Sequence, residues 1–396
     1  MSLPRECAAS PPGLRHPFTG LPLKPVTPEL WTDGATRWPV VDGIPYLRTG
    51  REALREAVVS ALERGDRLHA KALLLRDQDD HARLPPPPLA ETTRLVEGVE
   101  SRALGLRDAL EQLRFGPVAH YFAHRQSAPT FLSALGLLSQ HWDAPPCVVE
   151  VACGIGQVLH EVSVRGTPVL GVDVVFSKLW LARHFIVPDA MLLCADASAG
   201  HLPFAPLEGA TVMCHDALYF LPDKARVLGE LRRVAGSTGR VLVGHAHNRK
   251  VDQRGVGGTP LSPDEYAALM PGAACYDDAA FVTCFLEGTR VPATAPGQLD
   301  AAEALAFAWP GGPGRRAIDF GVPVPGARLR PNPLLEVRDG RVHPAWPTQG
   351  LAAEYATAHY LRGDAALLQQ ATARGADESR VRLARRRWLL NLPERW

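Results

Sequence analysis

Short apolar runs alternate with helix-like stripes through the middle of the chain. Residues 148–151 and 169–172 form apolar runs of the length expected for buried strands. Between them, Val158, Leu159 and Val162 fall on one side of a helix, as apolar residues three or four positions apart do. This alternation predicts an α/β fold with a doubly wound, parallel sheet, whose ligands bind at the carboxyl ends of the strands.

Small and acidic residues follow the apolar runs at the positions where strands should end. Gly154 and Gly156 come after the first run and allow the backbone to turn sharply and approach a ligand. Asp173 ends the second run, where an acidic residue can bind ribose hydroxyls, and Asp196 follows a third run. Together with Glu150 these residues predict a nucleotide-like cofactor, although glycines alone would serve equally well as plain turns.

The residue after the glycine turn narrows the choice of cofactor. A dinucleotide fingerprint needs a third glycine where Leu159 stands, so a pyrophosphate ligand is disfavoured. The run from Glu150 to Gly156 instead resembles motif I of the class I S-adenosylmethionine-dependent methyltransferases, in which an acidic residue precedes a glycine turn. Ala152 departs from that pattern, because it adds one methyl group where most members have glycine.

The resemblance covers about residues 145 to 248 and implies a Rossmann-like methyltransferase sheet that binds S-adenosyl-L-methionine. Asp173 then corresponds to the family's ribose ligand, and Asp196 to its adenine-contacting acid. Residues 211–221 resemble the fourth strand with its active-site edge, and residues 234–243 resemble the helix end, glycine turn and fifth strand.

The segment before motif I is a candidate lid. In many class I methyltransferases this segment folds over the methionine end of the cofactor, and residues 117–140 occupy its place here. Tyr121 and Arg125 are the lid residues that we expect to reach the cofactor, although core packing for the tyrosine and solvation for the arginine would explain them equally well. The full set of expected cofactor-binding residues is Glu150, Ala152, Gly154, Gly156, Asp173, Asp196, Ala197, Tyr121, Arg125 and Asp216.

The first 50 residues contain a hairpin signal at Asp42-Gly43, between possible strands at 38–41 and 44–47. This piece resembles the small zinc-ribbon proteins that partner tRNA, rRNA and protein methyltransferases. A zinc ribbon needs about four Cys or His ligands in paired spacing. Only Cys7 stands near the start, with Ser10 where its partner would fall. We therefore expect a degenerate segment without zinc that packs on the catalytic domain.

The remaining patterns set the expected domain organisation. Apolar residues at helical spacing predict helices within 51–80 and 90–114, and residues 281–286 are predicted as a further strand. Residues 290–350 are rich in Pro and Gly, and residues 351–392 are predicted as helical. The expected units are a zinc-ribbon-like segment at 1–50, a helical segment and cofactor lid at 51–140, a class I methyltransferase core at 141–290, and a C-terminal accessory segment at 291–396.

Composition limits the possible partners and the compartment. The chain has 43 basic and 42 acidic residues, so it carries no overall field that would select nucleic acid or an anionic membrane. No export signal or membrane-spanning stretch is evident, and a cytoplasmic location is expected. The cysteines near the predicted strands are expected to be buried thiols rather than disulfides; they are Cys147, Cys153, Cys194 and Cys214.

Methyl transfer needs few catalytic groups, because the protein chiefly brings the acceptor to the methyl group and disposes of one proton. The candidate proton acceptors stand at the ends of the fourth and fifth strands: His215 and Tyr219 on one, His245 and His247 on the other. We favour His245 or His247, because alternate residues of an extended segment share a face and histidine titrates near neutral pH.

Asp216 with His245 and His247 also has the composition of a two-His-one-carboxylate metal site. The acidic pair usual in methyltransferases that hold an ion at this edge is absent, so we expect no metal. No amide-binding motif follows the fourth strand, which disfavours an RNA or protein acceptor. The expected function is methylation of a small metabolite or short peptide in a biosynthetic pathway. The alternatives are a non-catalytic cofactor-binding scaffold and an RNA or protein methyltransferase, and the methylated atom and oligomeric state stay open.

Overall fold

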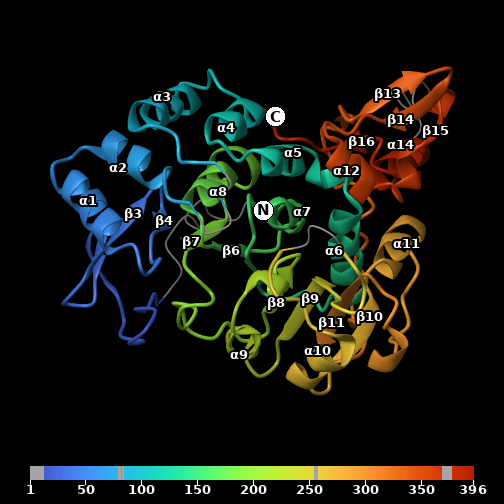
Figure 1. Ribbon diagram of the computed structural model, residues 1–396, viewed down its shortest axis with the longest axis horizontal. Coiled ribbons are helices and arrows are strands. Elements are labelled where there is room, and N and C mark those ends of the chain that lie inside the picture. The colour runs from blue at the N-terminus through green and yellow to red at the C-terminus, as the bar shows by residue number, and fades with distance from the viewer. Residues whose placement is uncertain (1–12, 79–81, 83, 254–256, 368–376) are drawn as a thin grey trace.

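A seven-stranded sheet lies at the centre of the computed structural model, which describes residues 13–78, 82, 84–253, 257–367 and 377–396 (Figure 1). The strands follow the order β7-β6-β5-β8-β9-β11-β10. Strands β5 to β9 pair in parallel, and β11 runs antiparallel to both neighbours. The predicted α/β, Rossmann-like fold is therefore confirmed. The strands are β5 (Val148–Val151), β6 (Val169–Asp173), β7 (Met191–Cys194), β8 (Thr211–His215), β9 (Arg240–His247), β10 (Ala274–Asp277) and β11 (Ala304–Trp309).

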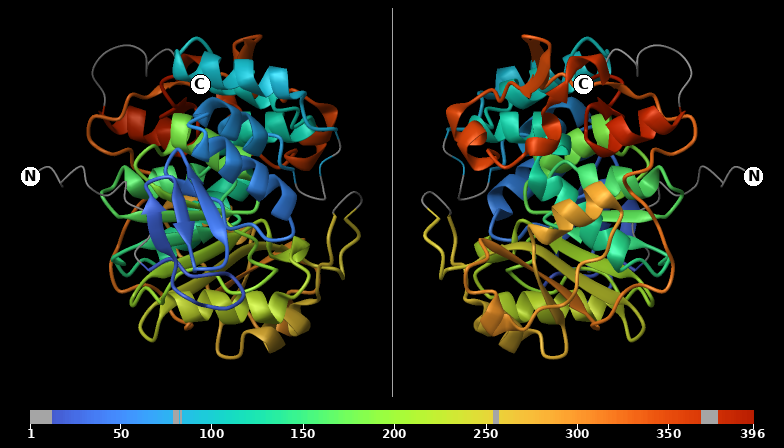
Figure 2. Two further views of the ribbon diagram at one scale, coloured as in Figure 1. Left: turned by 90° about the vertical axis from the view of Figure 1, so that its left-hand side faces the viewer. Right: turned by 90° about the vertical axis from the view of Figure 1, so that its right-hand side faces the viewer.

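Helices cover both faces of this sheet, so its central strands are buried along their whole length rather than at alternate residues (Figure 2). One face packs on α6 (Pro129–Gln140), α7 (Gln157–Ser163), α8 (Phe176–Leu181) and α11 (Ala280–Glu287). The other packs on α9 (Lys224–Ala235) and α10 (Pro263–Leu269). The chain order reverses between β5 and β8, so the expected ligand crevice lies at the carboxyl ends of these two strands.

Residues 281–286 form part of helix α11 and not the strand that we predicted. The buried residues Phe281, Cys284 and Phe285 are three and four positions apart, which is the spacing of a helix face. That face packs against α6. The strand in this region is β10, which comes directly before the helix, and the sheet takes β11 from beyond the boundary expected at residue 290.

The N-terminal segment forms an antiparallel sheet that joins the edge of the central one. Its strands are β1 (Lys24–Thr27), β2 (Leu30–Thr32), β3 (Arg37–Val41) and β4 (Ile44–Pro45). Asp42 and Gly43 have φ of 51° and 72°, as the predicted tight hairpin turn requires. The amide of Leu47 then donates to the carbonyl of Cys194 in β7 at 2.7 Å, so this segment covers the edge strand. Cys7 and Ser10, on which the zinc expectation rests, lie outside the described residues.

The described residues of the predicted helical region, 51–140, contain α6 and five further helices, and a buried ion pair connects this region to the sheet. The five further helices are α1 (Glu52–Glu63), α2 (Arg67–Leu74), α3 (Leu89–Glu100), α4 (Leu106–Gln112) and α5 (Pro117–His124). Just after α2, Asp77 accepts hydrogen bonds from Arg48 Nη1 at 2.9 Å and from Tyr46 Oη at 2.7 Å. Arg48 also donates to the carbonyl of Val174, at the end of β6, at 3.3 Å.

The C-terminal segment folds on itself and then returns to the helical region (Figure 1). Residues 351–392 are only partly helical, because β15 and β16 interrupt the predicted helix. Trp396 Nε1 donates to the carbonyl of Ala123 in α5 at 3.1 Å. No helix among the described residues is long and apolar enough to cross a membrane. The elements are β12 (Arg330–Pro331), β13 (Leu335–Arg338), β14 (Arg341–Pro344), α12 (Gln349–Glu354), β15 (Gly363–Asp364), α14 (Asp377–Arg385) and β16 (Leu389–Leu390).

We predict that Asp77→Ala lowers the free energy of unfolding by about 3 to 5 kcal/mol, because it leaves the buried Arg48 guanidinium without its counter-charge. Urea denaturation followed by circular dichroism measures the change. The control is Glu394→Ala, which removes a partner of Arg102 in an exposed pair with side chains 62% and 76% accessible. It should cost less than about 1 kcal/mol. Equal losses in the two variants would contradict the assigned role of Asp77.

Candidate functional site

The turn after β5 has a backbone conformation that favours glycine. Ala152, Gly154 and Gly156 have φ of 60°, 56° and 78°. A Cβ atom on Gly156 would lie 2.9 Å from Val187 Cγ1, and one on Gly154 would lie 3.0 Å from the ring of Phe122. The two glycines are therefore needed for close approach as well as for the turn. Ala152 adopts the same left-handed region with a side chain, so this strand end is strained.

Asp173 lies directly against the glycine turn. One carboxylate oxygen accepts the amide hydrogen of Gly154 at 2.9 Å, and the other accepts that of Val175 at 2.9 Å. The side chain is only 4% exposed. The structure thus brings together the two sequence features that predict a nucleotide site. Asp196 follows β7 along the same edge of the sheet and accepts the amide hydrogen of Ser198 at 2.7 Å.

Glu150 is buried inside the same strand end. Its Oε2 atom has no hydrogen-bond partner. Burial, opposed by the charge of Arg125 and assisted by the nearby negative charge of Asp173, raises the pKa of Glu150 to about 8. A buried acceptor without a donor, beside a turn that leaves no room for side chains, fits a ligand that supplies its own donor, such as an amino group.

The predicted lid lies over this turn. The predicted segment, residues 117–140, consists of α5, the short 3-10 helix Arg125–Ser127 and the buried helix α6. Gln157 Nε2, at the start of α7, donates to the carbonyl of Phe122 at 2.7 Å. Arg125 Nη1 donates to Thr130 Oγ1 at 2.6 Å, and the guanidinium lies 4.7 Å from the ring centroid of Tyr121. The lid therefore meets the glycine turn through Phe122, whereas the hydrogen bonds of Tyr121 and Arg125 lead to the end of β8.

Asp216 connects the lid to the end of β8. It accepts hydrogen bonds from Tyr121 Oη at 2.8 Å, Arg125 Nη1 at 3.3 Å and Tyr219 Oη at 3.0 Å. Burial alone would raise the pKa of Asp216, but the positive charges of His245 and Arg125 outweigh it and hold the pKa at about 2. The backbone φ of Asp216 is 56°, so this residue too is held in a strained conformation.

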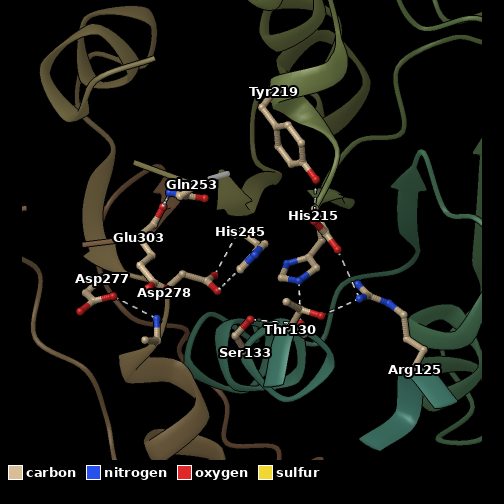
Figure 3. A network of polar contacts seen from close by, with 12 residues as sticks. Arg125, Thr130, Ser133, His215, Tyr219, His245, Gln253, Asp277, Asp278 and Glu303 are labelled. Atoms are coloured by element: carbon tan, nitrogen blue, oxygen red, sulfur yellow. Dashed lines mark hydrogen bonds and ion pairs between the residues drawn. The ribbon is translucent and has the colours of Figure 1, made fainter. Parts of the chain in front are cut away.

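The three histidines at this edge have different surroundings. His245 donates to Asp278 from its backbone amide and from Nδ1, both at 2.9 Å (Figure 3). Burial would lower the pKa of His245, but the bond to Asp278 and the charge of that residue raise it. The ring of His247 lies 4.9 Å from that of His245 and 4.4 Å from that of Tyr219, and burial lowers the pKa of His247.

His215 instead serves the packing of the sheet. Its Nε2 bonds to the carbonyl of Thr130 at 2.7 Å, and Nδ1 lies so close to Gly244 that a Cβ there would be 2.3 Å away. Burial lowers the pKa of His215 to about 4, so the ring is neutral. Among the four predicted catalytic candidates, His215 is therefore the one that this geometry disfavours.

Two further groups at the site were missed by the sequence analysis. Asp278 is 3% exposed and directly follows β10, so its position at a strand end was the signal that could have revealed it. Glu354, at the end of α12, interacts electrostatically with Asp216 and Arg125, and burial raises the pKa of Glu354. Nothing in the local sequence around Glu354 indicates this neighbourhood.

Asp216, His245 and His247 each place one potential metal-ligand atom within 4.8 Å of the others. Both oxygens of Asp216 already accept hydrogen bonds, and Arg125 balances its charge. His245 is engaged by Asp278 through Nδ1. His247 Nδ1 has no hydrogen-bond partner, and both the absence of a metal and a role of this cluster in proton transfer stay predictions.

Comparisons with known proteins agree with this geometry. Residues 149–243 match a family model described as a methyltransferase domain. No curated protein sequence matches the chain. Similar solved structures include a TehB-like methyltransferase from Corynebacterium glutamicum (14% identity, 46% of this chain and 84% of that chain, TM-score 0.32). Another is a chain of the Haloferax volcanii complex between the Trm112 methyltransferase activator and a putative methyltransferase (17% identity, 48% and 90%, TM-score 0.34). A third is S-adenosylmethionine-bound CalS10, an amino pentose methyltransferase from Micromonospora echinaspora (19% identity, 34% and 55%, TM-score 0.27).

The family match spans the strands that carry the glycine turn, Asp173 and Asp216. The assignment therefore rests on the same residues that form the site. Residues 149–243 form a class I methyltransferase domain, and the chain is an S-adenosylmethionine-dependent methyltransferase.

Proposed function

We propose that the protein methylates a small molecule or a short peptide, at the polar edge formed by the ends of β8 and β9. S-adenosylmethionine supplies an electrophilic methyl group on a sulfonium. In this proposal Asp173 accepts hydrogen bonds from the ribose hydroxyls, and Asp196 with Ala197 contacts the adenine. Glu150 accepts a bond from the amino group, and Arg125 pairs with the carboxylate of the methionine end. The supporting facts are the burial of Glu150 and Asp173 and the place of both beside the glycine turn.

The enclosure of the polar edge is the observation that carries the choice of acceptor. The C-terminal segment holds the lid from outside: Tyr360 Oη donates to the carbonyl of Ser127 at 2.7 Å, and Asn332 Nδ2 donates to Ser127 Oγ at 2.8 Å. Glu354 on the same segment faces the charges of Asp216 and Arg125. A small or slender acceptor fits an edge that this segment covers, whereas a folded protein or an RNA helix needs an open surface.

The near-zero net charge also supports a small acceptor. The chain has a formal net charge of +1, which gives no general attraction for a polyanion. The lid arginine is already paired with Asp216. The cationic groups nearest the site thus serve internal contacts, and a nucleic acid would find no cationic groove there among the described residues.

Incubation with methyl-labelled S-adenosylmethionine and a fractionated cell extract tests the acceptor class. We expect label in the small-molecule fraction, and much less in that fraction when the Asp173→Ala variant replaces the wild-type protein at a limiting cofactor concentration. Label that appears only in the protein or RNA fraction would contradict the proposed function.

Asp173→Ala should weaken the binding of S-adenosylmethionine by about 1 to 3 kcal/mol, because ribose hydroxyls would lose a buried acceptor. Calorimetric titration measures the affinity. Asp189→Ala is the matched control, since Asp189 is an exposed aspartate outside the predicted cofactor residues. It should leave the affinity unchanged. Unaltered binding by Asp173→Ala would remove this residue from the proposed ribose site.

Glu150→Gln should stabilise the cofactor-free protein increasingly as the pH rises. The pKa of Glu150 is raised from 4.5 to about 8 in the fold, so its contribution to stability is fully present below 4.5 and is lost as the pH rises through 8. The variant should gain about 1 to 3 kcal/mol over the wild type between pH 6 and pH 8.

Urea unfolding at the two pH values checks this prediction, with the exposed Glu56→Gln as control. The same Glu150→Gln variant should bind S-adenosylmethionine more weakly, because the uncharged amide holds a cationic amino group less well. A stability difference that does not depend on pH would show that Glu150 is ionised in the fold.

A further inference from the structure

Asp278 fixes His245 at two points. Its Oδ1 accepts the backbone amide of His245 and its Oδ2 accepts Nδ1–H, both at 2.9 Å. The backbone φ of His245 is 48°, in the left-handed region that is uncommon for residues other than glycine. Such a conformation costs free energy and persists only when neighbouring groups restrain the backbone. The amide bond to Asp278 is one such restraint, so the same carboxylate fixes the backbone and the ring.

This contact also decides which nitrogen of His245 can accept a proton. A carboxylate opposite Nδ1 keeps the proton on that nitrogen, because an ionised carboxylate can only accept hydrogen bonds. The Nε2 atom of the neutral ring then carries a free electron pair. His215 and His247 have no carboxylate partner of this kind: Nδ1 of each is buried without a hydrogen bond, and Nε2 of His215 bonds to the carbonyl of Thr130.

The charges around His245 favour the protonated ring once it has accepted a proton. Asp278 contributes most, and Asp216 adds a second negative charge from the end of β8. Arg125 opposes both, since its positive charge lowers the pKa of His245. The titratable and charged groups that face His245 from the surrounding elements are Asp278, Asp216, Arg125, His215, His247 and Glu354.

We propose that Asp278 is a positioning residue that presents His245 Nε2 as the general base for a hydroxyl acceptor. The inference rests on the proposed function and adds the class of the methylated group. A hydroxyl is a poor nucleophile until a base removes its proton, whereas a neutral amine attacks through its free electron pair and a thiol ionises near neutral pH without a base. A base held in one tautomer has a purpose only for a protic acceptor.

The step balances without a further reactant. The acceptor oxygen forms a bond to the methyl carbon as its O–H proton moves to Nε2 of His245. The carbon–sulfur bond breaks, and its electron pair stays on sulfur, which becomes a neutral thioether. The imidazolium that forms lies between Asp278 and Asp216, and it returns the proton to solvent before the next cycle.

Long-range proton–nitrogen NMR spectra of ¹⁵N-histidine-labelled protein test the positioning role without an acceptor. His245→Gln identifies the His245 signals. In the wild type we expect the neutral ring to carry its proton on Nδ1. In Asp278→Asn, the amide group should move the proton to Nε2, and the loss of the carboxylate charge should lower the pKa of His245.

Asp277→Asn is the matched control, because Asp277 carries the same charge but accepts the amide hydrogen of Ala279 instead (Figure 3). It should leave the tautomer and the pKa of His245 unchanged. A wild-type ring that is protonated on Nε2 would overturn the proposal even if Asp278→Asn fails to fold. An unchanged ring in a folded Asp278→Asn variant would also overturn it, as would stoichiometric zinc binding that shifts the His245 signals.

The acceptor class has its own readout. Metabolite extract treated with ¹³C-methyl S-adenosylmethionine and the wild-type protein should yield a product whose methyl carbon resonates as an O-methyl group. An N-, S- or C-methyl product would contradict the hydroxyl assignment. Calorimetric binding of S-adenosylmethionine to the wild type separates the two proposals: without binding the proposed function fails, whereas binding with the wrong tautomer or product overturns only this inference.

Discussion

The ion pair between Asp216 and Arg125 connects the two parts of the site. Asp216 ends a strand of the sheet, whereas Arg125 belongs to the lid, and both side chains are largely buried. Removing one partner from a buried pair leaves a charge that costs several kcal/mol, so the lid and the strand end are held together by more than surface contact. Tyr121 strengthens the connection, because it bonds to the same carboxylate and stacks on the same guanidinium.

Residues with a strained backbone conformation lie close to the ion pair between Asp216 and Arg125. Ala152 and Asp216 each follow a parallel strand, His245 lies near the end of β9, and all three have a positive φ without being glycine. Such conformations persist only where neighbouring groups determine them, and they concentrate at functional sites. Asp278 restrains His245, and the hydrogen bond from the Asp216 amide to the carbonyl of Gly244 at 3.0 Å restrains Asp216. The contacts that fix the polar edge are thus also the contacts that keep its backbone strained.

The N-terminal and C-terminal segments contact different parts of the methyltransferase core. The N-terminal sheet covers the edge strand β7 through the hydrogen bond from Leu47 to Cys194, and Arg48 reaches the end of β6. The C-terminal segment holds the lid through Tyr360, Asn332 and Trp396. An edge strand with unpaired backbone groups would favour association with other chains. The hydrogen bond from Leu47 to Cys194 therefore protects the β7 edge of the sheet.

Local signals account for what the sequence predicted. The glycine turn, Asp173 and Asp216 stand at strand ends, and parallel strands bring their carboxyl ends together whatever the rest of the chain does. The prediction of a strand at residues 281–286 was wrong, because an apolar run of that length fits a buried helix face as well as a strand. The pairing of Asp278 with His245 spans 33 residues and depends on the order of β9, β11 and β10, which no local pattern contains.

A crystal structure with bound S-adenosylhomocysteine tests the central claim most directly. We expect the ribose hydroxyls to bond to Asp173 and the homocysteine carboxylate to lie against Arg125. The sulfur should face the edge formed by Asp216 and His245. A ligand bound away from the glycine turn, or with its sulfur directed away from that edge, would contradict the assignment of both the cofactor site and the acceptor site.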